Sequence, residues 1–183
     1  HQHDMYLHVD GARISNAVAA LGCSLKEATS DCGVDIMSFG GTKNGLMMGE
    51  AILIFNEELR RHAPFYHKQT AQLFSKNRFI AAQFKALLSN ELWKRMAIHS
   101  NRMAQLLASE ITEIKGVAIT QKVQANAIFV IIPKHVVEPL REAYRFYDWN
   151  TVTGELRWMC SFDTTEEDVR GFAGKLKQLI SAS

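Results

Sequence analysis

The first half of the chain alternates short apolar runs with a helical pattern. The runs at residues 5–9, 34–39 and 50–55 have the length and composition of buried strands. A helical pattern at residues 11–22 lies between the first two runs and closes at a glycine. This order predicts an α/β sheet that contains parallel strands. The last two runs are joined by too few residues for a helical crossover, so we expect them to pair in the antiparallel sense.

The middle of the chain has the period of amphipathic helices. A helix is predicted over residues 78–88, and a longer one follows it and ends at Gly116. The longer helix carries one apolar stripe, which consists of Leu92, Met96, Met103, Leu107, Ile111 and Ile114. Because this helix can link two domains, we predict a large α/β domain over residues 1–100 and a small α+β domain over residues 101–183.

The last third predicts two strands and a final helix. The strands are expected at residues 127–133 and 155–162. A capping box, with Thr164 or Thr165 before acidic residues, is expected to start the helix. Its predicted buried face consists of Val169, Phe172, Ala173, Leu176 and Ile180.

The predicted sheet of the first half is small for an α/β domain. Three strands with one crossover bury little apolar surface, and the chain opens almost directly on a strand. We therefore expect that preceding residues, or another chain, complete the sheet. The chain is predicted to be the C-terminal part of a longer protein.

Composition narrows the class of function. Among 183 residues, 47% are apolar and the formal charge is only +2, with dispersed lysines and arginines, so we expect no nucleic-acid partner. No apolar run approaches the roughly 20 residues of a membrane span. The histidines form no metal-binding pair, and Cys23, Cys32 and Cys160 are predicted to be free thiols in a reducing compartment. We expect a cytoplasmic protein without a metal site.

Asp10 is the first candidate functional residue. It ends an apolar run, and ligands bind at the carboxyl ends of strands in open α/β sheets. Aspartate is also a preferred N-cap residue, and a helix is expected to begin near Ala12. Both interpretations remain open from the residues alone.

Lys43 is the second candidate, in the segment GGTKNG. The threonine precedes the lysine, so the order of a phosphate-binding P-loop is absent. The pair Asn44-Gly45 favours a hairpin turn with a solvated lysine. The alternative is a partly desolvated amine with a lowered pKa, which can form a Schiff base.

A Schiff-base lysine with an upstream aspartate is what a pyridoxal-phosphate site requires, because the aspartate pairs with the protonated pyridine nitrogen. The segments LHVDGARISNA and SFGGTKNG closely resemble the threonine aldolases, in the β-eliminating lyase group of fold-type I pyridoxal-phosphate enzymes. The resemblance continues at NRFIAAQFKALL, QANAIFVIIP and LRWMCSFDTTEEDV, and so spans nearly all of the chain.

This resemblance implies a fold-type I large domain, the cofactor pyridoxal 5′-phosphate and an aldolase. The enzyme would cleave threonine or a related β-hydroxy-α-amino acid to glycine and an aldehyde. Lys43 resembles the lysine that forms the internal aldimine, and Asp10 the partner of the pyridinium nitrogen. Arg13 resembles the arginine that reaches the phenolic oxygen of the cofactor.

Four further residues take roles from the resemblance. Arg157 resembles the arginine that binds the substrate α-carboxylate by a bidentate contact. Arg78 lies where the family has a second arginine near the cofactor phosphate. Thr42 and Ser38 are expected to supply hydroxyls to the phosphate or to neighbouring backbone groups. Taken alone, Arg13 would be a surface helix residue, and Arg78 can equally be an ordinary residue at a helix start.

The sequence also departs from the family pattern. The ring-stacking histidine and the phosphate-binding loop of the family precede the segment HVDGAR and lie outside this chain. Cys160 or Ser161 stands where many members have a histidine. Two alternatives therefore remain: another fold-type I lyase that catalyses β-elimination, or a truncated relative with a structural role. The resemblance implies a homodimer or homotetramer that includes the missing N-terminal half.

Overall fold

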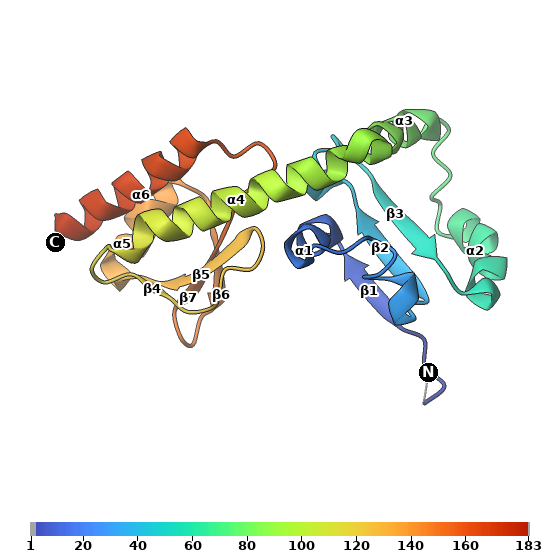
Figure 1. Cartoon of the computed structure of the whole chain (residues 1–183), viewed down its shortest axis with the longest axis horizontal. Coiled ribbons are helices and arrows are strands. Elements are labelled where there is room, and N and C mark those ends of the chain that lie inside the picture. The colour runs from blue at the N-terminus through green and yellow to red at the C-terminus, as the bar shows by residue number, and fades with distance from the viewer. Residues whose placement is uncertain (1–2, 183) are drawn as a thin grey trace. The chain divides into compact units, whose positions relative to one another are not determined.

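The computed structural model describes residues 3–182, and the chain forms two compact units, His1–Ala97 and Ile98–Ser183 (Figure 1). The division lies within helix α4 (Leu92–Thr112), which supplies residues to both units. The assignment of residues 1–100 and 101–183 as a large and a small domain stays a prediction.

The first unit is built on a three-stranded sheet with the order β1-β2-β3. Strand β1 (His8–Gly11) runs parallel to β2 (Ile36–Gly40), and β2 runs antiparallel to β3 (Glu50–Ile54), as the sequence predicts. Helix α1 (Ile14–Leu21) and a short 3₁₀ helix, η1 (Ser30–Cys32), connect the parallel pair. Helix α1 ends at Gly22, whose φ of 69° is in the left-handed region that favours glycine.

Two predicted boundaries in this unit are wrong. The strand expected at residues 5–9 is found at His8–Gly11, because its ladder to β2 begins only at the pair His8 and Ile36. Residues 5–7 are exposed. Helix α1 begins at Ile14 rather than near Ala12, since residues 12 and 13 form the turn that follows β1.

The remaining helices of the first unit are α2 (Glu57–Gln69) and α3 (Asn77–Leu88), followed by a 3₁₀ turn, η3 (Ser89–Glu91). Helix α3 confirms the helix predicted over residues 78–88, and Leu87 is its buried residue. A small core forms where Phe84 of α3 packs against Phe39 of β2, with ring centroids 6.2 Å apart.

The second unit is built on an antiparallel sheet with the order β4-β5-β7-β6. The strands are β4 (Ala118–Ile119), β5 (Ala127–Ile131), β6 (Tyr147–Asn150) and β7 (Glu155–Met159). Helices α5 (Lys134–Ala143) and α6 (Glu166–Ser181) pack with the second part of α4 on a core that contains Trp158. Both predicted strands exist but end earlier than expected: β5 ends at Ile131 and Pro133 is the N-cap of α5, and β7 pairs with β5 only as far as Met159.

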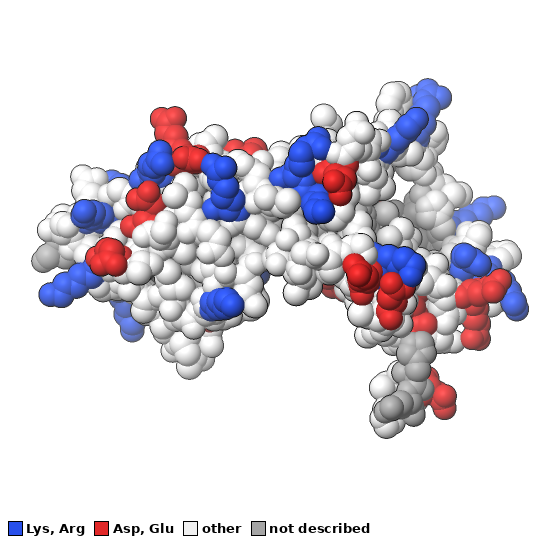
Figure 2. Space-filling view, viewed as in Figure 1, with Lys and Arg blue, Asp and Glu red and all other residues white. Residues whose placement is uncertain are grey.

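The predicted helix faces of this unit are confirmed for most of their residues, while Ile114 and Ile180 are only half-buried. On α4, Met103, Leu107 and Ile111 are buried. On α6, the capping box is formed by Thr165 and Asp168, as the acidic first turn predicts. On the face of the molecule drawn in Figure 2, basic and acidic side chains are interspersed over both units, without a large patch of one sign.

Candidate active site

The parallel pairing of β1 and β2 brings Asp10 and Ser38 together. The two residues are register partners, and the Ser38 hydroxyl donates to Asp10 Oδ1 over 3.4 Å. The Ala12 amide donates to the same oxygen over 3.1 Å. Asp10 therefore fixes the turn after β1, but it is not the N-cap of α1, because that position belongs to Arg13. Its exposed carboxylate keeps Oδ2 outside both of these contacts.

Glycines allow a close backbone approach at this edge of the sheet. A Cβ at Gly40 would lie 2.6 Å from the carbonyl carbon and 2.7 Å from Cα of Ala12. A Cβ at Gly11 would overlap the carbonyl oxygen of Ser38. The turn that follows Asp10 (the Asp10 turn) and the end of β2 thus meet backbone to backbone, which only glycine permits.

The segment after β2 carries Lys43 on a 3₁₀ turn, η2 (Thr42–Asn44), which is followed by Gly45 at a φ of 108°. The hairpin with a solvated lysine that Asn44-Gly45 favours is found, since β2 and β3 pair in the antiparallel sense and Lys43 is exposed, although a long loop joins the two strands. The desolvation considered for the Lys43 amine is not found, because the buried side chain of the turn is Asn44.

Thr42 holds this loop closed. Its hydroxyl accepts a hydrogen bond from the Gly49 amide at 3.1 Å and lies 3.3 Å from the Gly49 carbonyl oxygen, to which it donates. Its own amide donates to the Glu50 carboxylate over 3.3 Å. Of the two roles expected for the Thr42 hydroxyl, the structure shows the contact with backbone.

The two remaining residues of the first unit that are predicted to contact the cofactor differ in exposure. Arg13 is half-buried at the start of α1. Arg78 is exposed on α3, with its guanidinium carbon 5.2 Å from the centroid of the Phe79 ring. Their contacts with a cofactor stay predictions.

Arg157 lies in the second unit, on β7, between its register partners Phe129 of β5 and Tyr147 of β6. Its guanidinium carbon lies 4.8 Å from the centroid of the Trp149 ring, which meets Phe129 edge to face at 5.1 Å. Arg157 Nε is buried without a hydrogen-bond partner. A buried N–H group without an acceptor is costly, so this position fits an anionic ligand such as a carboxylate.

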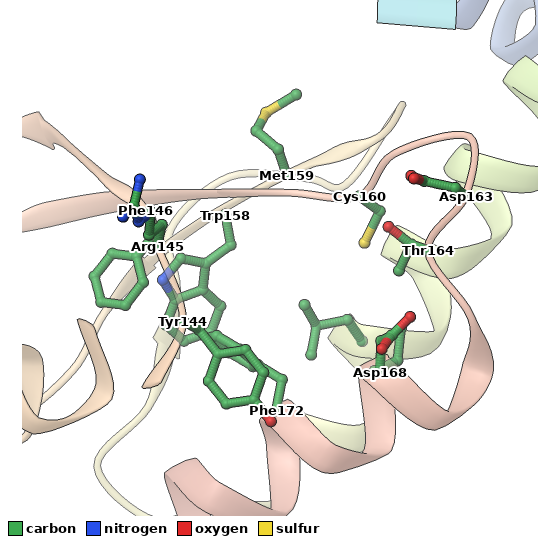
Figure 3. Close-up of a pocket in the computed structure, with 12 residues that line it drawn as sticks. Tyr144, Arg145, Phe146, Trp158, Met159, Cys160, Asp163, Thr164, Asp168 and Phe172 are labelled. Atoms are coloured by element: carbon green, nitrogen blue, oxygen red, sulfur yellow. The ribbon is translucent and has the colours of Figure 1, made fainter. Parts of the chain in front are cut away.

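A cavity of about 330 Å³ also lies in the second unit (Figure 3). Aromatic side chains line it, and Figure 3 shows Trp158 near Phe172, which it meets edge to face, with Cys160 directly after the strand that carries Trp158. Burial raises the pKa of the Cys160 thiol to about 11, so the thiol is neutral at physiological pH and is no nucleophile. Arg157 is not among the lining residues, so the cavity is separate from the predicted carboxylate position.

Two residues of the candidate site escape sequence reasoning. Asn44 appears in the sequence as a turn residue, but its side chain is buried and bonded to α4. Trp149 packs on Arg157, and the alternation of Tyr147 and Trp149 is the one signal that could have indicated a strand there.

Comparison with known proteins adds close relatives. The chain is 45% identical over 177 residues to the low specificity L-threonine aldolase of a Pseudomonas species. The alignment covers 96% of this chain and 51% of that protein. The chain is 44% identical over 181 residues to the same enzyme of Pseudomonas aeruginosa, covering 97% of this chain and 51% of that protein. The chain thus spans about half the length of the curated relatives that it matches.

The fold has solved counterparts. The threonine aldolase of Leishmania major superposes with a TM-score of 0.85 at 28% identity, over 98% of this chain and 53% of that chain. This match confirms the α/β fold of fold-type I pyridoxal-phosphate enzymes predicted from the sequence. The family model described as β-eliminating lyase matches residues 1–134. Since that match covers most of its length, the chain belongs to the β-eliminating lyase family.

Proposed function

We propose that the protein carrying this chain is a pyridoxal-phosphate-dependent aldolase. It cleaves the Cα–Cβ bond of threonine or a related β-hydroxy-α-amino acid. The β-hydroxyl loses its proton as the aldehyde leaves, and protonation of Cα gives glycine. The observation that carries the proposal is the exposed Lys43, on the closed loop that follows β2, the strand whose Ser38 pairs with Asp10 of β1.

The residues present fit pyridoxal 5′-phosphate. A primary amine, a carboxylate and hydroxyls are the donor set that its aldehyde, pyridine nitrogen and polar substituents require. The glycine contact between the Asp10 turn and the end of β2 removes side chains from this edge of the sheet. When bound, the cofactor supplies an electron-withdrawing ring that stabilises negative charge at the substrate Cα.

Asp10 and Lys43 would hold the cofactor from two sides. Lys43 presents Nζ as the nucleophile for the cofactor aldehyde. Asp10 uses Oδ1 for the Ala12 amide and the Ser38 hydroxyl, so the carboxylate has a fixed orientation and can offer Oδ2 to the protonated pyridine nitrogen. Arg13 would approach the phenolic oxygen, and Arg78 the phosphate.

Ser38 would act mainly through Asp10, because its hydroxyl already donates to that carboxylate. The Thr42 hydroxyl is engaged with Gly49 and would maintain the loop. Arg157 would bind the substrate α-carboxylate through its unpartnered Nε and the adjoining terminal nitrogen, a bidentate contact that also orients the substrate.

The proposal is tested by borohydride reduction of the protein loaded with pyridoxal 5′-phosphate, followed by peptide mass spectrometry. A phosphopyridoxyl group is expected on Lys43, together with cleavage of threonine to glycine and acetaldehyde. The variant Lys43→Ala should lose both, whereas Lys68→Ala, which removes an exposed lysine of α2, should keep both. Retained cleavage by Lys43→Ala would refute the assignment.

We also propose a homodimer or homotetramer in the cytoplasm, completed by the rest of the same protein. Large apolar side chains exposed on the first unit, such as Met47, Ile52 and Phe65, support burial by further protein surface. Among the described residues, no helix combines the length and apolarity needed to cross a bilayer. Light scattering of the protein in solution tests the oligomeric state.

A further inference from the structure

The loop that carries Lys43 contains one buried polar side chain. Asn44 is only 3% exposed, and its side-chain amide donates to the backbone carbonyl oxygen of Trp93 over 2.9 Å. Trp93 lies in the first turn of α4, far from Asn44 in sequence. A buried amide is retained at low cost only where it has such a partner, so the contact holds the loop against the helix.

The same loop is attached at two other places. Thr42 closes its base through the amide and carbonyl of Gly49. The side-chain oxygen of Gln83 on α3 accepts from the amides of Met47 and Met48, at 3.0 and 3.4 Å. Because Lys43 lies between Thr42 and Asn44, its backbone is held on both sides while its side chain remains exposed.

Helix α4 also contacts the element that follows Asp10. Asn16 of α1 is buried, and its amide lies 3.5 Å from the carbonyl oxygen of Ala97. Ala97 is one helical turn beyond Trp93, so the two carbonyls lie on one side of α4. Two buried asparagines thus attach the Lys43 loop and the Asp10 side of the sheet to neighbouring turns of one helix.

We infer that Asn44 is a positioning residue for Lys43. By binding the lysine loop to α4, Asn44 fixes the distance between this loop and the Asp10 turn. The inference rests on the proposed function for its chemical consequence, but the attachment of the loop can be measured without cofactor. The exposed lysine then needs only side-chain rotation to reach a ligand at the strand ends, because the backbone beneath it is already in place.

The test compares two alanine variants of the full-length polypeptide. Asn44→Ala removes the contact with Trp93. Asn126→Ala is the matched control, because Asn126 is 7% exposed and its amide donates to the Cys160 carbonyl over 2.8 Å, in the second unit. The first readout is hydrogen exchange of the peptide that spans residues 41–46, without cofactor. The second is the concentration of pyridoxal 5′-phosphate that gives half-maximal borohydride trapping on Lys43.

We expect Asn44→Ala to speed exchange in residues 41–46 and to raise the half-maximal concentration, each about five- to tenfold, the size of one lost buried hydrogen bond. Asn126→Ala should change neither. Unchanged exchange in Asn44→Ala, or equal changes in both variants, would overturn the inference. If borohydride never traps pyridoxal 5′-phosphate on Lys43 of the unaltered protein, the proposed function fails, and the positioning role fails with it. The hydrogen-exchange result still decides whether Asn44 holds the loop.

Discussion

Replacing Gly40 by alanine should destabilise the first unit selectively. The new Cβ would lie 2.6 Å from the carbonyl carbon of Ala12, whereas ordinary contact begins at 3.4 Å. The two backbones must therefore separate by close to 1 Å, and neither atom belongs to a flexible side chain. Overpacking of this kind costs up to about 3 kcal/mol. Alanine returns up to about 1 kcal/mol by restricting the unfolded chain, which leaves a net loss of roughly 2 kcal/mol.

Urea unfolding followed by hydrogen exchange of peptides from each unit measures this loss. We expect faster exchange of the slowest amides in the first unit, with little change in the second. Gly174→Ala is a control of opposite sign, because nothing lies within 4 Å of a Cβ in that position on α6. It should stabilise by about 0.5–1 kcal/mol. A Gly40→Ala variant as stable as the unaltered chain would refute the close backbone contact, and with it the geometry that places Asp10 beside Ser38.

Three further outcomes follow from individual contacts. The pKa of Asp35 is held below its usual value, first by the Leu7 amide, which donates to the carboxylate over 2.8 Å, and then by the Asn56 side chain. The stability that ionised Asp35 contributes is therefore fully present above the unfolded pKa of about 3.9 and is lost as the pH falls through the folded pKa. In Asp35→Asn, the urea midpoint of unfolding should therefore fall less steeply below about pH 4 than in the unaltered chain. Equal slopes in the two proteins would contradict this. Burial raises the pKa of Cys160 to about 11, so this thiol should resist a thiol reagent at pH 8 while the other two thiols react. Equal reaction rates of all three thiols would show that Cys160 is accessible to solvent. Trp149→Leu removes the ring that holds the Arg157 guanidinium, so KM for threonine should rise several-fold at unchanged kcat. Trp149→Phe keeps an aromatic ring and should restore KM. A change in kcat alone would exclude this positioning role.

The sheet of the first unit could be predicted because its strands are strongly apolar and its connections short. The parallel and antiparallel pairs follow from connection length alone. Helix α2 could not be predicted, since no residue in it is buried. Strand β6 was missed for a similar reason: it lies at the sheet edge and all of its residues are exposed.

Some features of the candidate site could likewise be predicted from the sequence, and others could not. Asp10 and Ser38 are register partners on neighbouring parallel strands, so their meeting follows from the predicted pairing of these strands. Which side chain of the η2 turn points inward depends on α4, nearly fifty residues away, and no local rule contains that information. The stacking of Trp149 on Arg157 likewise depends on the pairing of β6 with β7 across a register shift.

The distribution of indole rings gives this chain built-in optical reporters. Trp158 is 2% exposed among aromatic rings in the core of the second unit, so its emission should lie at short wavelength and shift to the red when that core opens. Trp149 is 51% exposed and stacked on the Arg157 cation, so an anion that binds there should change its emission without unfolding. Trp93 lies in the first unit, beneath the Asn44 contact. Because the chain has three tryptophans, variants that keep one at a time would let fluorescence follow the first-unit fold, the second-unit core and the occupancy of the arginine separately.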